Sequence, residues 1–140
     1  MSNKSIKIVI DTNLWVSMAM GSRVISEQML QIIENPDIEI FISLELIEEL
    51  TETLTKPRLQ KYLSQARTTY LFELIWQKAQ LIKVNIALKI CRDPKDDFII
   101  NLATEANTHY IITGDIDLLV LNPVDKIEVI TIADFLKKMS

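Results

Sequence analysis

Short runs of β-branched and aliphatic residues alternate with longer stretches of helical periodicity, and this alternation constrains the fold more than any other feature of the chain. The runs predict strands at 6–10, 38–42, 110–113 and 127–130, with a weaker strand at 81–85. The intervening stretches predict helices at 24–34, 44–55, 94–107 and 131–139, two further helices within 57–80 and a helical turn at 116–121. Alternating strands and helices pack as a parallel sheet with right-handed crossovers. We therefore expect an α/β fold, a three-layer α/β/α sandwich around a central parallel sheet of about five strands.

The chain has the length and composition of one globular domain over residues 1–140, because 49% of its residues are hydrophobic. Its single cysteine, Cys91, excludes an internal disulfide, and with one histidine, His109, it cannot form a structural zinc site alone. These features favour a reducing, cytoplasmic location. The polar start of the chain and the charges that interrupt every apolar run predict neither a signal peptide nor a membrane span.

The formal net charge of −4 argues against a protein that binds nucleic acid through overall basicity. One segment is locally basic: no acidic residue occurs between Thr53 and Phe72, and the segment contains Lys56, Arg58, Lys61 and Arg67. Two interpretations stay open for it, an RNA contact and an ordinary solvated helical surface.

Two aspartates follow predicted strands directly. Asp11 opens a polar turn, Asp11-Thr12-Asn13, after the first strand, and Asp115 follows the strand at 110–113. We expect Gly114 to allow a sharp bend that turns Asp115 back over the sheet. Each aspartate alone is also a common turn former. Together, at the carboxyl ends of parallel strands, two repelling carboxylates indicate a bound cation.

Helical segments supply further acids. Of the four glutamates at 45, 48, 49 and 52, Glu49 is nearest the apolar boundary on a helical wheel, with Glu48 second. In the segment Arg-Asp-Pro-Lys-Asp-Asp, which starts at Arg92, the wheel mildly favours Asp96 over Asp97, although acids in a first helical turn also complement the helix dipole and close a capping box. Residue pattern alone leaves Asp96 and Asp97 unresolved.

Taken in order, these fragments resemble the PIN-domain nuclease family, which includes the VapC-like toxins of bacterial toxin–antitoxin pairs. The resemblance covers nearly the whole chain and rests on Ile-Asp-Thr-Asn, on Glu49, on Cys-Arg-Asp-Pro followed by Lys-Asp-Asp-Phe-Ile-Ile, and on Ile-Thr-Gly-Asp-Ile-Asp-Leu-Leu. It implies a metal-dependent endoribonuclease with an acidic quartet, carried over here as Asp11, Glu49, Asp97 and Asp115. Family spacing back from Thr113 selects Asp97 over Asp96. The resemblance also implies that Asp117 extends the metal site and that Asn13 and Thr113 support it.

Carboxylate ligands suit Mg²⁺ or Mn²⁺, which would activate water for attack on a phosphodiester, with Arg92 or Lys95 as possible phosphate contacts. Asn13 stands where an aspartyl phosphatase has its second Asp, and two glycines cannot form a Gly-rich phosphate loop. The rival interpretation is a catalytically silent PIN-fold module that acts through protein partners. The resemblance implies an RNA substrate, an antitoxin partner and a homodimer. Trp76, with Leu71, Leu74 and Ile75, is a candidate dimer patch, for which core packing is the alternative.

Overall fold

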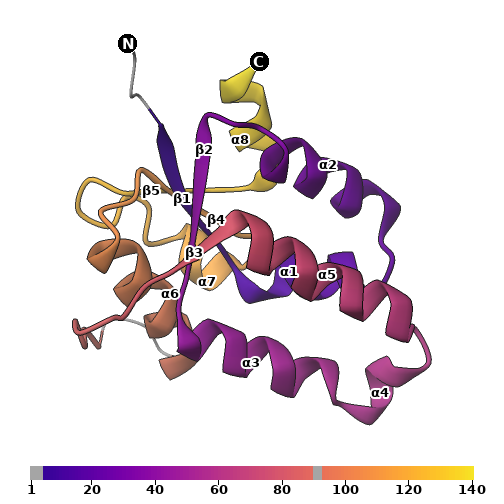
Figure 1. Ribbon diagram of the computed structural model, residues 1–140. Helices are drawn as coiled ribbons and strands as arrows, with labels where there is room; N and C mark the ends of the chain where they lie inside the picture. Colours follow the sequence, from indigo (N-terminus) through magenta and orange to yellow (C-terminus); the bar gives the residue numbers. More distant parts are fainter. Residues whose placement is uncertain (1–4, 90–92) are drawn as a thin grey trace.

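A parallel sheet of five strands runs through the computed structural model, which describes residues 5–89 and 93–140 (Figure 1). The strands are β1 (Ile6–Ile10), β2 (Ile38–Ile42), β3 (Ala79–Leu81), β4 (Tyr110–Ile112) and β5 (Glu128–Ile130). Their order is β3-β2-β1-β4-β5, and every neighbouring pair is parallel. The predicted parallel sheet is thus confirmed. Cys91 and Arg92, which entered the sequence argument, lie outside the described residues.

The chain builds the sheet outward from β1 in both directions. The connections from β1 to β3 contain α1 (Thr12–Ala19), α2 (Arg23–Ile33), α3 (Leu44–Leu54), α4 (Pro57–Gln60) and α5 (Gln65–Lys78). The chain then returns through α6 (Pro94–Glu105) to place β4 on the other side of β1, and α7 (Ile116–Leu119), β5 and α8 (Ile132–Met139) follow. The strand order therefore reverses between β1 and β4. In open α/β sheets, ligands bind beyond the carboxyl ends of the strands at such a reversal.

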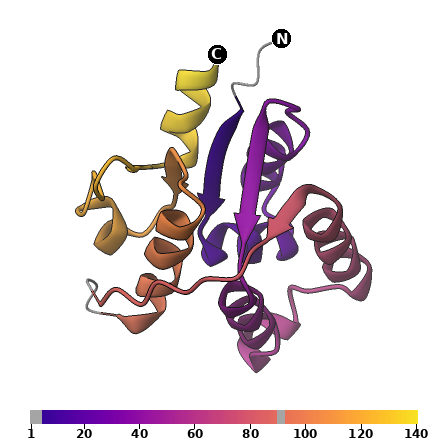
Figure 2. The ribbon, with the colours of Figure 1, turned by 60° about the vertical axis from the view of Figure 1, so that its left-hand side comes forward.

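Helices cover both faces of the sheet, as the two ribbon views show (Figures 1 and 2). Helix α6 contacts β1, β2 and β4, whereas α2 contacts β2 and α8. In β1 and β2 the last three residues are buried and the first two are half-buried. The carboxyl ends of the central strands are therefore held firmly by the core, because close-packed side chains resist displacement. The expected three-layer sandwich is confirmed.

Two elements differ from the sequence prediction. Residues 12–19, expected to begin as a polar turn, form α1, which buries Leu14, Trp15 and Val16 among others. This helix is apolar on most of its surface, so it lacks the one-sided periodicity that marks an amphipathic helix. The third strand covers 79–81 rather than 81–85, because pairing with β2 ends where the Ile82 N–H donates to the Ile42 carbonyl.

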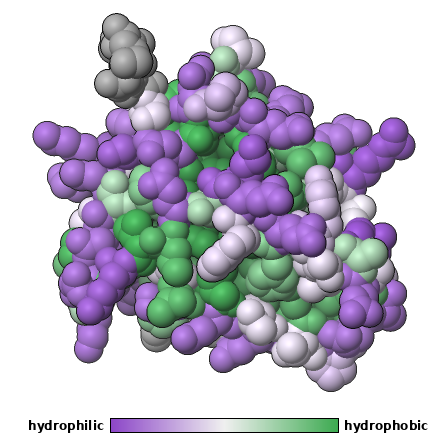
Figure 3. Space-filling view, viewed as in Figure 1, coloured by the Kyte–Doolittle hydropathy of each residue, from purple (hydrophilic) through white to green (hydrophobic). Residues whose placement is uncertain are grey.

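An apolar groove of about 600 Å³ lies between α3 and α5 beside β3. Its exposed apolar side chains include Leu44, Leu81 and Trp76, the last of these 82% exposed. Figure 3 shows apolar side chains gathered on this face of the molecule. Leu71 and Ile75 belong to the core, at 1% and 2% exposure, so the predicted patch keeps Trp76 and the half-buried Leu74. Among the helices of the described residues, none combines the length and the apolar character that crossing a membrane requires.

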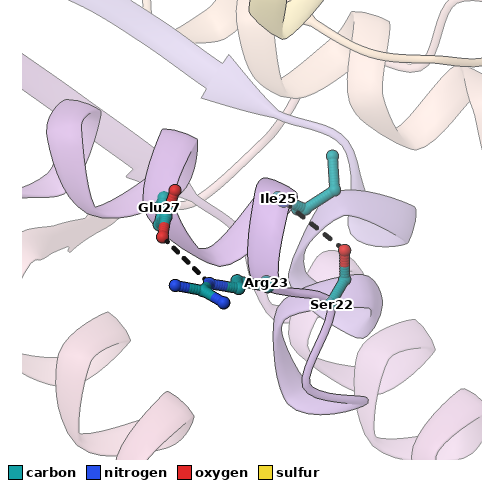
Figure 4. A network of polar contacts seen from close by, with 4 residues as sticks. All are labelled: Ser22, Arg23, Ile25 and Glu27. Atoms are coloured by element: carbon teal, nitrogen blue, oxygen red, sulfur yellow. Dashed lines mark hydrogen bonds and ion pairs between the residues drawn. The ribbon is translucent and has the colours of Figure 1, made fainter.

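Side-chain caps begin several helices. The Ser43 hydroxyl accepts a hydrogen bond from the Leu46 N–H (3.2 Å), and serine is among the residues preferred at the start of a helix for this reason. At the start of α2, Ser22 Oγ accepts from the Ile25 N–H (3.4 Å), and Arg23 pairs with Glu27 one turn later (Figure 4). Both members of that ion pair are exposed, so the hydroxyl cap contributes more to the start of α2 than the charges do.

Candidate active site

The candidate active site lies where the strand order reverses, between the carboxyl ends of β1 and β4. The Asp11 N–H donates to the Ile112 carbonyl (2.9 Å), which continues the pairing of the two strands by one residue. Asp11 is 5% exposed and Thr113 is fully buried. Two polar residues from distant parts of the chain are thus fixed side by side by backbone pairing.

Thr113 connects the two strand-end aspartates. Its hydroxyl donates to Asp11 Oδ2 (2.7 Å) and accepts from the Asp115 N–H (3.0 Å). Asp115 Oδ1 in turn accepts from the Asp117 N–H (2.9 Å) and so begins α7. The turn after β4 is therefore held by side-chain oxygens.

The expected role of Gly114 in this turn is wrong. Gly114 has no left-handed backbone conformation, and a Cβ at this position would have no atom within 4 Å. Neither backbone conformation nor space therefore requires glycine here, and the turn is held by the hydrogen bonds of Thr113 and Asp115.

Burial raises the pKa of Asp11 above its ordinary value of 3.8, because the protein interior disfavours the charged carboxylate. The hydrogen bond from Thr113 opposes this shift, and the negative charge of Asp115 adds to it. Asp11 is therefore a carboxylate at the end of a strand, and its ionised form is disfavoured both by burial and by the negative charge of Asp115. This is the electrostatic condition that a divalent cation relieves.

Asp96, in the first turn of α6, belongs to the same electrostatic cluster. Partial burial raises its pKa from 3.8 to about 6, and the next largest causes are the charges of Asp115 and Asp11, followed by Asp93 and Asp117. The structure thus brings acids from β1, α6 and the turn after β4 close enough to repel one another. Among the described residues, however, no three Asp, Glu, His or Cys side chains form a closed set of metal ligands.

Asp97 is 8% exposed, and Asp96 is only half-buried. The helical-wheel argument that placed Asp96 nearer the apolar side overlooked Ile100, which is fully buried and lies on the face of Asp97. The choice of Asp97 as the third acid, made on family spacing, stays a prediction. Because the charges of Asp11 and Asp115 repel that of Asp96, Asp96 is an equal candidate for the third acid of the site.

The remaining predicted residues lie on several different elements. Glu49 is half-buried on α3 and Glu48 is exposed, in keeping with the preference for Glu49, and Asn13 is exposed in the first turn of α1. His109 lies at the opposite, amino end of β4, where its Nδ1 accepts the Lys7 N–H (2.9 Å). Sequence analysis did not single out Asp93 as a site residue, although it lies three residues before Asp96 and its negative charge adds to the rise of the Asp96 pKa.

A doubly wound parallel sheet with carboxylates at the reversal of strand order defines the class of this protein, an α/β fold with a group of acids at the carboxyl edge of its sheet. The sequence profile of the PIN domain family matches residues 7–117, most of the chain, and the chain belongs to that family. PIN domains are generally nucleases, and they typically use divalent metal ions.

Two known proteins illustrate the relationship. The uncharacterized protein MJ1680 of Methanocaldococcus jannaschii is 32% identical over 127 residues, which cover 90% of this chain and 81% of that protein. A chain in the crystal structure of VapBC2 from Rickettsia felis, bound to a DNA fragment from their promoter, superposes with a TM-score of 0.57 at 13% identity. That match covers 89% of this chain and 97% of the other, and it shows a shared fold.

Proposed function

We propose that residues 1–140 act as a single nuclease domain, an endoribonuclease that hydrolyses RNA phosphodiester bonds with Mg²⁺ or Mn²⁺. The observation that carries this proposal is the repelling group of carboxylates around the buried Asp11, with Asp96 and Asp115, at the carboxyl edge of the sheet. Acids buried near one another destabilise a fold unless a cation or a proton is shared among them.

The chemistry of the side chains present fits a hard divalent ion. Carboxylate oxygens are the preferred ligands of Mg²⁺ and Mn²⁺, whereas zinc sites generally contain imidazole or thiolate. We propose ligands from the quartet Asp11, Glu49, Asp97 and Asp115, with Asp117 extending the set and Asp96 as the alternative to Asp97. Thr113 and Asn13 support the ligands through hydrogen bonds.

When bound, the cation would acidify a water molecule and neutralise charge on the attacked phosphate. The side chains prepare the site for that chemistry. Thr113 holds the Asp11 carboxylate in one orientation, and the turn at Asp115 is locked by two hydrogen bonds, so neither acid has to reorganise when substrate arrives. No side-chain nucleophile is needed in this scheme.

Purified protein should cleave single-stranded RNA in Mn²⁺ or Mg²⁺ and stop cleaving when EDTA is added. Asp11→Asn, which keeps size and removes charge, should abolish cleavage, and Asp37→Asn should not, because Asp37 is exposed before the amino end of β2. Parallel assays of Asp96→Asn and Asp97→Asn decide which acid serves the metal. Cleavage that persists in EDTA or in the Asp11→Asn variant would refute the metal mechanism. If the wild-type protein does not cleave RNA, the catalytically silent binding module is favoured instead.

We further propose that the protein is the toxin of a toxin–antitoxin pair, and that it acts in the cytoplasm as a homodimer on single-stranded or structured RNA. The fold match to a chain of the VapBC2 structure supports this proposal. Co-expression with the product of a neighbouring small gene, followed by co-purification and a growth assay, tests it.

A further inference from the structure

Residues 82–89, called the strap below, run from the end of β3 to the region before α6 without forming a helix or a strand (Figure 2). Backbone N–H and C=O groups outside regular structure need partners when they lie against the protein. Ile82 and Val84 pack on the hydrophobic core, so the strap is held close to the molecule's body.

Two side chains of α6 supply those partners. Glu105 Oε1 accepts the N–H groups of Asn85 (2.7 Å) and Ile86 (3.3 Å). Asn101 Oδ1 accepts the Leu88 N–H (2.9 Å), and its Nδ2 donates to the Leu88 carbonyl (3.3 Å). Asn101 is 7% exposed, so this two-point contact is shielded from competing water.

The direction of these contacts is informative. The later residue of α6, Glu105, holds the earlier part of the strap, and Asn101, one turn closer to the helix start, holds Leu88. The strap therefore runs antiparallel to α6 and leads toward its first turn. Asp97 is the next residue in the same row, since residues four apart share one face of a helix.

The first turn of α6 lies at the end of the helix toward which the strap leads. The middle of α6 is anchored by Ile99, Ile100 and Leu102, which are buried. Asp97 is also buried, and Asn101, which binds the Leu88 backbone, lies one turn after it on the same face of the helix. The contacts at Leu88 therefore fix the strap beside the part of α6 that carries the acids.

We propose that Asn101 and Glu105 are positioning residues, which pin the strap to α6 and thereby hold the acids of its first turn at the sheet edge. This inference rests on the proposed metal-dependent function. Neither residue has to touch metal or RNA in this role, because supporting groups control affinity by orienting the ligands.

The test compares Glu105→Ala with Glu105→Gln, which keeps the accepting oxygen, and with Glu34→Ala, an exposed glutamate at the end of α2. Amide hydrogen exchange on metal-free protein should speed up at Asn85 and Ile86 in Glu105→Ala alone. The same variant should bind Mn²⁺ about tenfold more weakly, measured from the EPR signal of free Mn²⁺. Its kcat should fall while its KM for RNA stays unchanged, and Glu105→Gln should restore wild-type values. Should Glu105→Ala fail to fold, Asn101→Leu, which keeps a side chain branched at Cγ and removes its polar atoms, repeats the test at Leu88.

Unchanged amide exchange in Glu105→Ala overturns the inference, and so does faster exchange with unchanged Mn²⁺ affinity and kcat, because the strap is then structural only. A loss shared by Glu105→Gln also overturns it. A wild type that neither binds Mn²⁺ nor cleaves RNA refutes the proposed function itself, and this inference with it. A wild type that does both, beside an equally competent Glu105→Ala, refutes the inference alone.

Discussion

Thr113 shows how much of the candidate site depends on one hydroxyl. It is fully buried and serves two neighbours, donating to the Asp11 carboxylate and accepting from the Asp115 N–H. A buried hydroxyl with both functions satisfied adds stability, and its removal takes one hydrogen bond from the Asp11 carboxylate and one from the Asp115 N–H.

Thr113→Val, which is nearly isosteric, should lower the free energy of unfolding at pH 7 by about 1–3 kcal/mol, because the buried Asp11 carboxylate would lose the hydrogen bond from the hydroxyl and the Asp115 N–H would lose its acceptor. Urea denaturation monitored by circular dichroism measures the loss. Thr113→Ser keeps the hydroxyl and should lose less stability. Equal losses in the two variants would contradict this prediction, because the γ-methyl group would then contribute as much stability as the hydroxyl.

Asp96 makes the metal-free protein sensitive to pH. Its pKa is raised from 3.8 to about 6 in the folded protein, so the folded state holds this proton more tightly than the unfolded state does. The resulting contribution to stability is complete below about pH 4 and is lost as the pH rises toward about 6. The free energy of unfolding of wild type relative to Asp96→Asn should therefore fall across that interval.

Thermal or urea unfolding from pH 4 to 7 in EDTA measures this difference, with Asp37→Asn as the matched control. Mn²⁺, which binds the folded state, should raise the Tm of wild type and raise it less in Asp96→Asn. A wild-type curve parallel to that of Asp96→Asn would show that the acids around Asp96 do not repel it.

At the scale of elements, the basic segment divides into two parts. Lys56, Arg58 and Lys61 are exposed in and around α4. Arg67 has a structural role, because its guanidinium donates to the carbonyls of Tyr62 (2.8 Å) and Ala19 (3.3 Å) and so joins α5 to the end of α1. Only the first three cations are thus available as an RNA contact of the kind proposed from the sequence.

Replacing Lys56, Arg58 and Lys61 together by Ala should weaken RNA binding and reduce the slope of log K against log salt by about 2, from about 0.7 per lost phosphate contact on a single strand. Fluorescence anisotropy over a series of salt concentrations gives the slope. The control triple replaces exposed cations elsewhere, Arg23, Lys126 and Lys137. A slope equal to that of wild type would show that the region around α4 is an ordinary solvated surface and not an RNA contact.

At the scale of the whole molecule, the groove between α3 and α5 exposes apolar side chains to solvent, and the exposed Trp76 lines it. Large exposed apolar patches commonly mark protein interfaces. Of the patch predicted from the sequence, Trp76 and the half-buried Leu74 remain candidates, because Leu71 and Ile75 are buried in the core.

If this face forms the homodimer, wild type should have the mass of two chains in light scattering, and Trp76→Glu should have the mass of one, because a charge would be buried in the contact. Val24→Glu replaces another exposed apolar residue, 65% exposed on α2, and should stay dimeric. A dimer that survives Trp76→Glu places the contact elsewhere, and a monomeric wild type excludes the homodimer.

The sequence by itself determined the elements whose signals are local. Strands β1, β2, β4 and β5 follow from β-branched runs, and α3 and α6 follow from the helical periodicity that predicted helices at 44–55 and 94–107. Asp11 and Asp115 were recognisable because each directly follows such a strand. Local patterns succeed here because side-chain periodicity and capping depend on neighbours within a few residues.

Only the tertiary structure decided which acids meet. The return of the chain through α6 places β4 beside β1, and this brings Asp115 and Asp96 to Asp11 across about a hundred residues of sequence. The same long-range packing buries the helix that residues 12–19 form, and it places the strap against Asn101 and Glu105. The turn after β4 depends on the hydrogen bonds of Thr113 rather than on Gly114. Such contacts leave no periodicity in the sequence, because they depend on strand order and on surfaces that exist only once the sheet has formed.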